Sequence, residues 1–277
     1  MANGEVKLVL RVEGGIADEG VLDLYDAADT IHGLARSVNM VAHSLANDGE
    51  LKKKNKVTRG VKTVIRPSIK GCFEEQVGII FEEDFVASVG SSVFSNVFWD
   101  YLGWTWSGAV GVEWEPATPY VKALTKNEKY NVLIDEIGDA LEIPMRYLHQ
   151  PIVSDNGVKI FINRPKAGDV LKFDKETLDY VTTREESIET EWIVGNITRY
   201  NVLSVFGRLF SDEEGRVISF NFADGENRRV RDLAIKSTQE HEKESQGKMN
   251  LLVSKVISAH GKVKRYVLHD ILDINGN

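Results

Sequence analysis

Apolar and polar residues alternate near the start of the chain and again after residue 60. Val6–Val12 is rich in strand-forming residues and ends at a pair of glycines. Val61–Arg66 has the same character, and Phe73–Phe81 follows a turn as its expected antiparallel partner. These three runs predict three strands of one sheet.

Helical periodicity lies between and after these strands. Asp18 can cap a first helix, and apolar residues then recur every three or four positions, which predicts one buried stripe: Leu24, Ala28, Ile31, Ala35, Val38, Ala42 and Leu45. Residues 85–102 and Tyr130–Ile143 are also periodic, and Pro144 is expected to end the latter helix. The order strand–helix–strand–strand predicts an α+β fold in which a helix covers one face of the sheet.

The chain is expected to divide near residue 185. Before that point, Val158–Asn163 and Val170–Phe173 are short strand candidates, and a short helix is expected from Asp174 to Tyr180. The stretch 182–191 is acidic and polar, and the pattern after it becomes mostly β. We therefore predict an α+β head with added helices over residues 1–185 and a small β domain over 186–277.

The small β domain is expected to be a closed barrel. Its strands are predicted at residues 192–200, 203–210, 216–222, 249–258 and 262–268, with a polar, partly helical segment at 228–246. Gly195 interrupts the first strand and predicts a bulge. This order is typical of a five-stranded Greek-key barrel of the OB type, and an SH3-like barrel is the nearest alternative.

Composition and charge exclude several classes of protein. The net charge of −8 argues against a protein coated in nucleic acid, and the single cysteine, Cys72, excludes an internal disulfide and a multi-cysteine zinc site. The first residues lack the apolar core of a secretory signal, so a cytoplasmic location is expected. The chain contains no GxGxxG, GxxxxGK[ST], GxSxG or HExxH motif. We therefore predict no catalytic residue, no metal site and no cofactor.

Aromatic residues are concentrated between residues 94 and 114. Four of the five tryptophans lie there, and Asp100 is the only charged residue from Phe85 to Val112. The segment is too diluted by serine and glycine for a membrane span, and it lacks the basic face of an interfacial helix. The alternatives are a core helix or an interface with a second copy or a protein partner. The interface residues would be Ser92, Ser95, Phe94, Trp99, Trp104 and Trp106.

Basic residues form a second distinctive group. Residues 51–70 carry eight Lys or Arg and no acid, whereas residues 188–277 carry thirteen charges of each sign. The basic run is either a solvated loop or an arm that binds phosphates, and the barrel is either an assembly module or a nucleic-acid-binding domain. The candidate nucleic-acid contacts are Lys52, Lys53, Lys54, Lys56, Arg59, Arg208, Arg216, Arg228, Arg229 and Lys264.

One row of polar residues on the first helix is the main candidate for chemistry in the head. His32, Arg36, Asn39 and His43 are spaced by four, three and four residues, so they share one side of the helix. Such a row could line a groove, as a hydrolase would need, or it could be an ordinary exposed polar face.

The chain resembles a group of bacterial proteins that pair an α+β head with a small C-terminal β domain. The resemblance rests on the Val6–Val12 strand, the long helix to Leu45, the run Gly71-Cys-Phe-Glu-Glu75 and the strand Val194-Gly-Asn-Ile-Thr198. It implies a place among mobile-element and phage-defence genes. The leading hypothesis is a non-enzymatic binding or assembly protein; the alternatives are a nucleic-acid-binding protein and a hydrolase.

Overall fold

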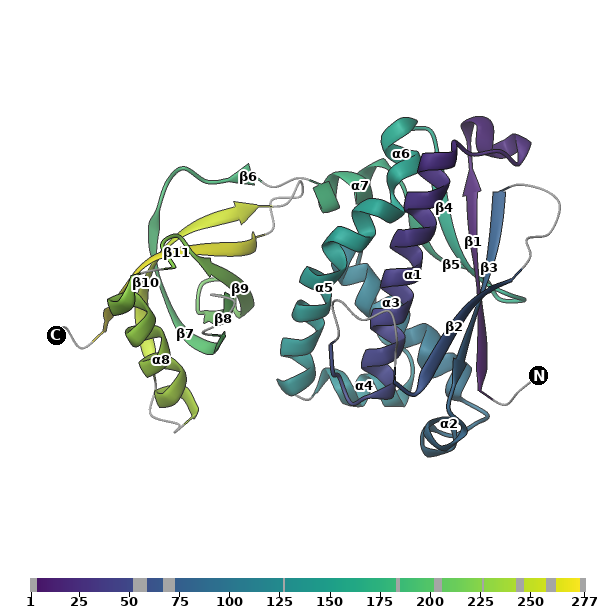
Figure 1. Ribbon diagram of the computed structural model, residues 1–277. Coiled ribbons are helices and arrows are strands. Elements are labelled where there is room, and N and C mark those ends of the chain that lie inside the picture. The colour runs from purple at the N-terminus through teal and green to yellow at the C-terminus, as the bar shows by residue number, and fades with distance from the viewer. Residues whose placement is uncertain are drawn as a thin grey trace. The chain divides into compact units, whose positions relative to one another are not determined.

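The computed structural model divides into two compact units, residues 1–182 and 183–277, which are described separately (Figure 1). It describes residues 4–51, 59–66, 73–126, 128–182, 185–201, 206–225, 227–242, 247–257 and 263–274. The boundary between the units lies three residues before the expected one. The basic residues Lys52, Lys53, Lys54 and Lys56 fall outside the described residues.

Unit 1 contains a five-stranded antiparallel sheet. Its strand order is β2 (Val61–Arg66), β3 (Phe73–Phe81), β1 (Glu5–Glu13), β4 (Lys159–Arg164) and β5 (Gly168–Phe173). Alternate residues of β1 are buried, beginning with Val6 and Leu8, because one face of the sheet packs on helices. The strands predicted from alternation are confirmed.

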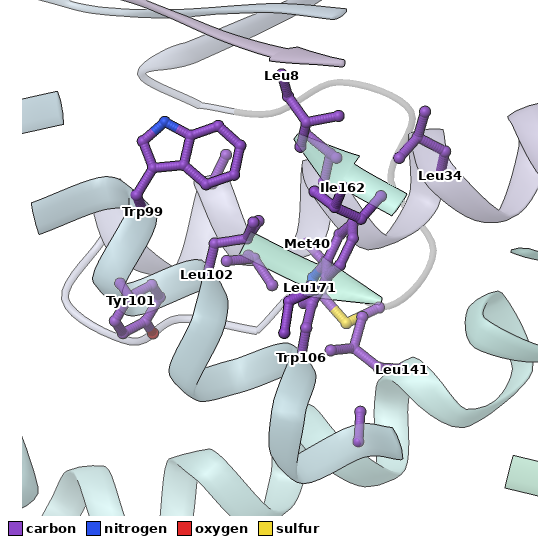
Figure 2. Close-up of a cluster of buried hydrophobic side chains, with 14 of the residues drawn as sticks. Leu8, Leu34, Met40, Trp99, Tyr101, Leu102, Trp106, Leu141, Ile162 and Leu171 are labelled. Carbon is purple, nitrogen blue, oxygen red and sulfur yellow. The ribbon is translucent and has the colours of Figure 1, made fainter. Parts of the chain in front are cut away.

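Helices cover that face of the sheet, as Figure 1 shows. The long ones are α1 (Leu24–Ala46), α3 (Phe94–Val110) and α5 (Glu128–Leu148). The shorter ones are η1 (Gly15–Glu19), α2 (Glu83–Val89), α4 (Pro119–Thr125), α6 (Gln150–Ser154) and α7 (Lys175–Thr182). Figure 2 shows the resulting core, in which Leu8 of β1, Leu34 of α1, Trp106 of α3 and Leu141 of α5 belong to one cluster.

Three helix ends differ from their predicted positions. The expected helix over residues 85–102 is two helices, because Gly90 adopts a φ of 104° between α2 and α3. The first long helix is capped by Asp23, whose carboxylate accepts from the Tyr25 N–H at 2.8 Å, and not by Asp18. Pro144 lies inside α5 and does not end it.

The buried face of α1 is also different from the predicted stripe. Leu24, Ala28 and Ala35 are exposed, whereas Thr30, Gly33, Leu34 and Ser37 are buried. Small residues occupy this face because α1 packs closely on α5: a Cβ atom on Gly33 would lie 2.5 Å from the Pro144 carbonyl oxygen. Hydrophobicity alone therefore identified the wrong side of the N-terminal half of α1.

The position of Asp100, the single charged residue between Phe85 and Val112, is explained by its hydrogen bonds. Its buried carboxylate accepts hydrogen bonds from the Trp114 indole at 3.1 Å, from the Ala117 N–H at 3.0 Å, and from the Thr118 N–H and hydroxyl at 2.7 and 2.6 Å. These bonds fix the turn after α3, and the Thr118 hydroxyl also caps α4. A buried charge is tolerated here because donors surround it.

Unit 2 is a closed five-stranded barrel, which confirms the predicted fold. Its strands are β7 (Glu191–Asn201), β8 (Phe206–Ser211), β9 (Arg216–Phe222), β10 (Lys248–Ile257) and β11 (Val263–Asp273), and α8 (Arg228–Glu242) joins the third strand to the fourth. β7 pairs with both β8 and β10, while β9 and β11 pair in parallel. The β10–β11 ladder closes the ring, and a two-residue strand β6 (Glu185–Glu186) extends it. This order is that of an OB-type barrel.

The bulge in β7 lies three residues beyond its predicted place. The register with β8 shifts between Ile197 and Arg199, not at Gly195. The Ile197 N–H donates instead to the Ser237 hydroxyl of α8 at 3.0 Å, and that hydroxyl donates to the Gly247 carbonyl at 2.7 Å. Gly195 serves another purpose, since a Cβ atom there would lie 2.2 Å from the Phe210 carbonyl oxygen.

Candidate interaction surfaces

The aromatic segment belongs to the core of unit 1. Phe94, Trp99 and Trp106 are buried, and Trp104 is half-buried against the same cluster. The prediction that these four side chains form an interface is therefore wrong for the three buried ones. The helices of unit 1 cover them because α3 lies between the sheet and α5.

Ser92 and Ser95, the polar part of the predicted interface, lie at the surface. Ser92 is exposed in the turn before α3, and Ser95 is half-buried. An Arg164 guanidinium nitrogen donates to the Asn96 side-chain oxygen at 2.6 Å and lies 3.4 Å from the Ser95 hydroxyl. Ser95 and Asn96 therefore contact the C-terminal end of β4.

The barrel's basic residues are mostly engaged in contacts within unit 2. Arg216 donates to the Val263 carbonyl at 2.5 Å, and Arg229 bonds both Asp270 and the Ile271 carbonyl. Arg208 is buried, Lys264 is half-buried, and Arg228 lies 3.9 Å from Asp232. Arg59 is exposed in unit 1. Among the described candidates, the arginines that bond carbonyl or carboxylate groups of their own unit are therefore partly occupied by internal contacts.

A cavity of about 370 Å³ opens at the C-terminal end of α1. Its lining residues are Ala46, Asn47, Glu50, Arg59, Gly60, Glu82 and Phe85. Next to it lies His43, which is buried and whose Nε2 is 4.0 Å from a Glu50 carboxylate oxygen. The size suits a small ligand, and the histidine next to a carboxylate is the arrangement that a hydrolase would need.

The hydrogen bonds of His43 argue against catalysis there. The Arg59 N–H donates to His43 Nδ1 at 3.3 Å, and the Asn47 amide nitrogen lies 3.1 Å from the same atom. Since a backbone N–H can only donate, Nδ1 accepts, and the proton of the neutral ring sits on Nε2. A general base needs an unprotonated nitrogen facing its substrate. His43 therefore joins α1 to the start of β2 rather than serving as a base.

The other members of the predicted polar row are spread along α1. His32 is exposed and stacks on Tyr147 of α5, with ring centroids 5.1 Å apart. The Asn39 side-chain oxygen accepts from the Thr63 hydroxyl at 2.7 Å. Arg36 is half-buried between them. The row does not line one groove, because it passes from solvent into the core.

The described residues lack a metal-binding cluster and a membrane-spanning helix. No group of three or more His, Cys, Asp and Glu side chains among them could hold a metal ion. No helix in the described part of the chain is long and apolar enough to cross a membrane.

The outer face of the barrel carries an apolar patch that we did not predict. All five tryptophans lie in the described part of the chain, and Trp192 is the one whose side chain is exposed, at 49%. It pairs across the sheet with Leu252, and the neighbouring row is Val194, Asn250 and Leu272. Val194 and Leu272 are also exposed. We call Trp192, Val194, Leu252 and Leu272 the barrel patch.

The sequence does contain a signal for this patch. A strand with one solvated face alternates apolar and polar residues, but Trp192, Ile193 and Val194 are consecutive apolar residues. Ile193 points into the barrel core, so its two neighbours must point outward. We did not predict the patch because the other four tryptophans, which pack in or against the core of unit 1, suggested that an aromatic interface would lie in unit 1 instead.

A second uncharged surface lies on the N-terminal half of α1. Between residues 24 and 36, all of which are described, the exposed positions are Leu24, Tyr25, Ala28, His32 and Ala35. None is acidic or basic apart from the histidine. A solvated helix face ordinarily carries Lys or Glu, so this face is unusual for a surface.

Comparison with known proteins identifies the family of the chain. Residues 8–182 match the family described as Domain of unknown function (DUF7946). The match covers more than half of the 277 residues and lies within unit 1. No curated protein and no solved structure matches the chain. The chain therefore belongs to the DUF7946 family.

Proposed function

We propose that this protein is a non-enzymatic binding protein that recognises another protein through the barrel patch. The observation that supports the proposal is the exposed Trp192 in a row of apolar side chains. Tryptophan is enriched among the residues that dominate binding energy, and exposed apolar patches rimmed by polar groups are typical of interaction sites. A polar pair borders the patch here, since Asp270 lies across the sheet from Leu252 and forms an ion pair with Arg229.

The position of the patch within the barrel favours a protein partner. It lies on β7, β10 and β11, whereas OB-type barrels bind oligonucleotides across their second and third strands, which here are β8 and β9. The patch offers apolar contact and an amide, Asn250, rather than a row of cations. Those groups suit a partner surface with apolar residues at its centre.

Capture on immobilised protein tests this function. The full chain and its Trp192→Arg variant are each used to retain proteins from cells that produce it. The matched control is Ile188→Arg, because Ile188 is fully exposed in unit 2 but lies outside the patch. We expect the wild type and the control to retain the same partner and Trp192→Arg to lose it. Equal retention by all three would exclude the barrel patch.

We further propose a cytoplasmic setting in a bacterial defence or mobile-element system. The support is the resemblance of the head and of the Val194–Thr198 strand to bacterial proteins of that kind, together with the single cysteine. Phage challenge of cells with and without the gene tests the defence role. Equal plaque counts across a broad phage panel would count against it.

Nucleic-acid binding is a second candidate function, favoured by the OB-type strand order of unit 2. Phosphate contacts make affinity fall steeply with salt. Filter binding at low salt, with single- and double-stranded DNA and RNA, tests this candidate. The variant is Lys53→Glu/Lys54→Glu, and Lys122→Glu/Lys126→Glu is the control because it changes the net charge equally. Loss of retention only in the first variant would support the basic arm, and no retention by the wild type would remove this candidate.

A further inference from the structure

We propose that the cavity at the C-terminal end of α1 binds a free α-amino acid with an apolar side chain. Arg59 pairs with the carboxylate of this ligand, and Glu82 pairs with its ammonium group. The cavity belongs to unit 1 and the barrel patch to unit 2, so the inference goes beyond the binding function proposed above.

The backbone around the cavity is fixed by hydrogen bonds from two sides. The Arg59 N–H donates to His43 Nδ1 at 3.3 Å, and the Arg59 carbonyl accepts from the Asn47 amide at 2.9 Å. The next carbonyl, that of Gly60, accepts from the Glu82 N–H at 3.0 Å. These bonds join the end of α1 to the start of β2 and to the residue after β3. The walls are therefore preorganised, which lowers the cost of ordering a site on binding.

Two opposite charges line the cavity without pairing. Neither the Arg59 side chain nor the Glu82 side chain forms an ion pair or hydrogen bond with any residue that the structure describes. Glu82 stands at the N-cap position of α2, yet its carboxylate does not bond that helix. The third charged residue, Glu50, lies 4.0 Å from the protonated Nε2 of His43. Arg59 and Glu82 are therefore available to a ligand.

This charge pattern favours a zwitterion. An anion such as inorganic phosphate could pair with Arg59, but it would also meet two carboxylates and the C-terminal end of α1, where the helix dipole is negative. A simple amine could pair with Glu82 but would leave the guanidinium without a partner. The carboxylate of an amino acid matches the planar fork of arginine, and its ammonium group matches a carboxylate. An α-amino acid therefore satisfies both charges at once.

A firmly packed aromatic ring forms another wall of the cavity. Phe85 lines the cavity, and its ring packs against Phe81 and Phe94, with centroids 6.0 and 5.8 Å apart. Aromatic rings attract apolar and aromatic groups beyond the area that they bury. The volume of about 370 Å³ lies within the range of small-molecule sites. This wall therefore favours an amino acid whose side chain is apolar.

Gly60 keeps the space between α1 and Glu82 open. A Cβ atom on Gly60 would lie 3.9 Å from the Ala46 Cβ and 3.9 Å from a Glu82 carboxylate oxygen, so a side chain there would enter the cavity. The φ of Gly60 is 75°, a conformation that glycine adopts without strain. Glycine at this position therefore permits the turn and leaves room for a ligand.

Isothermal titration calorimetry of the full chain with L-phenylalanine and L-leucine tests the site. We expect both amino acids to bind at one site per chain. Two further probes keep the phenylalanine side chain and separate its charges: phenethylamine lacks the carboxylate, and 3-phenylpropanoate lacks the ammonium group. Each should bind about tenfold more weakly than L-phenylalanine, or weaker still, because one charged hydrogen bond is lost.

Variants assign each charge to its partner. Glu82→Gln should weaken L-phenylalanine about tenfold and leave 3-phenylpropanoate unchanged, because that probe has no ammonium group. Arg59→Gln should weaken L-phenylalanine to a similar extent and leave phenethylamine unchanged. Glu83→Gln and Lys62→Gln are the matched controls, since both residues are exposed and neither lines the cavity. All four side chains are exposed, so the variants should keep the wild-type melting temperature.

The outcomes also separate this inference from the barrel function. Trp192→Arg should leave amino-acid binding unchanged, and Glu82→Gln should leave partner capture by the barrel unchanged. Failure of both amino acids to bind at millimolar concentration overturns the inference. Phenethylamine that binds as tightly as L-phenylalanine also overturns it, because the site would then take an amine alone. Equal weakening by Glu82→Gln and Glu83→Gln would place the ligand outside the cavity.

Discussion

Gly33 of α1 lies directly against the backbone of Leu148 in α5: a Cβ atom on Gly33 would be 2.4 Å from the Leu148 nitrogen. Backbone atoms cannot move aside as a flexible side chain can. We expect Gly33→Ala to lower the free energy of unfolding of unit 1 by about 3 kcal/mol through overpacking. Gly108→Ala is the matched control, because nothing lies within 4 Å of an added Cβ there, and it should raise stability slightly. Urea unfolding followed by tryptophan fluorescence reports on unit 1, and equal stability of the two variants would contradict the close contact.

Asp100 should be among the most sensitive polar positions in the chain. Asp100→Asn removes the charge and replaces one accepting oxygen with an NH2 group, a donor that faces the donors of Trp114, Ala117 and Thr118. Because hydrogen bonds to a buried charge are strong, we expect a loss of about 3 kcal/mol in unfolding free energy. Thr118→Val, which removes one of these bonds and the cap of α4, should cost about 1 kcal/mol. Thermal unfolding monitored by near-ultraviolet circular dichroism measures both, and an unchanged melting temperature for Asp100→Asn would refute the role.

His149 should make unit 1 less stable in mild acid. Its ring is buried, with Nδ1 2.7 Å from the Met145 carbonyl and Nε2 3.0 Å from the Thr177 hydroxyl. Burial lowers the pKa of His149 from 6.5 to about 4. Between those two values the unfolded chain binds a proton that the folded chain does not, so stability is fully present above pH 6.5. It falls at about 1.4 kcal/mol per pH unit as the pH drops toward 4.

Urea titrations at half-unit pH steps check this slope. The His149→Gln variant has no titrating ring at this position. Between pH 6.5 and 4, its unfolding free energy should therefore fall less steeply than that of the wild type, by about 1.4 kcal/mol per pH unit, whatever the absolute stability of the variant. Identical slopes for the wild type and the variant would show that His149 is not the group responsible.

Ser237 should stabilise the barrel because its hydroxyl accepts the hydrogen bond of the Ile197 N–H at the β7 bulge. Ser237→Ala leaves the buried Ile197 N–H without the hydroxyl that accepts from it, and an unsatisfied buried donor costs about 1–3 kcal/mol. Thr238→Ala on the next position is the control, since its hydroxyl donates to the Ala234 carbonyl within α8. Trp192, the one tryptophan of unit 2, supplies a fluorescence signal for the transition. A Ser237→Ala barrel as stable as the control would contradict this assignment.

Strand alternation predicted the strands of both sheets except the two-residue β6, because most of these strands have one face buried against their own core. Helix α1 shows where the method fails. In the N-terminal half of this helix the buried residues include Thr30, Gly33 and Ser37, small residues that hydrophobicity scales do not mark, whereas Leu24 and Tyr25 are exposed. Close packing of two helices selects for small size rather than for hydrophobicity, so the predicted apolar stripe is wrong there, although its later members Val38, Ala42 and Leu45 are buried.

The surfaces were harder to predict than the fold. The cluster of Trp99, Trp104 and Trp106 looked like an interface because it lacks charges, but a helix enclosed between a sheet and another helix lacks charges for the same reason. Whether an uncharged segment is buried by its own chain depends on long-range packing. Sequence periodicity carries no information about which other element covers a given helix.

The two hydrophobic cores share no residue. Recombination of the gene near the codon for residue 182 would therefore separate the two units without removing a core residue from either. The head could then be joined to another C-terminal domain and keep its own packing. The family match ends at the same boundary, residue 182, and does not include the barrel. A different C-terminal domain could therefore follow the head without any change to the packing of the head itself.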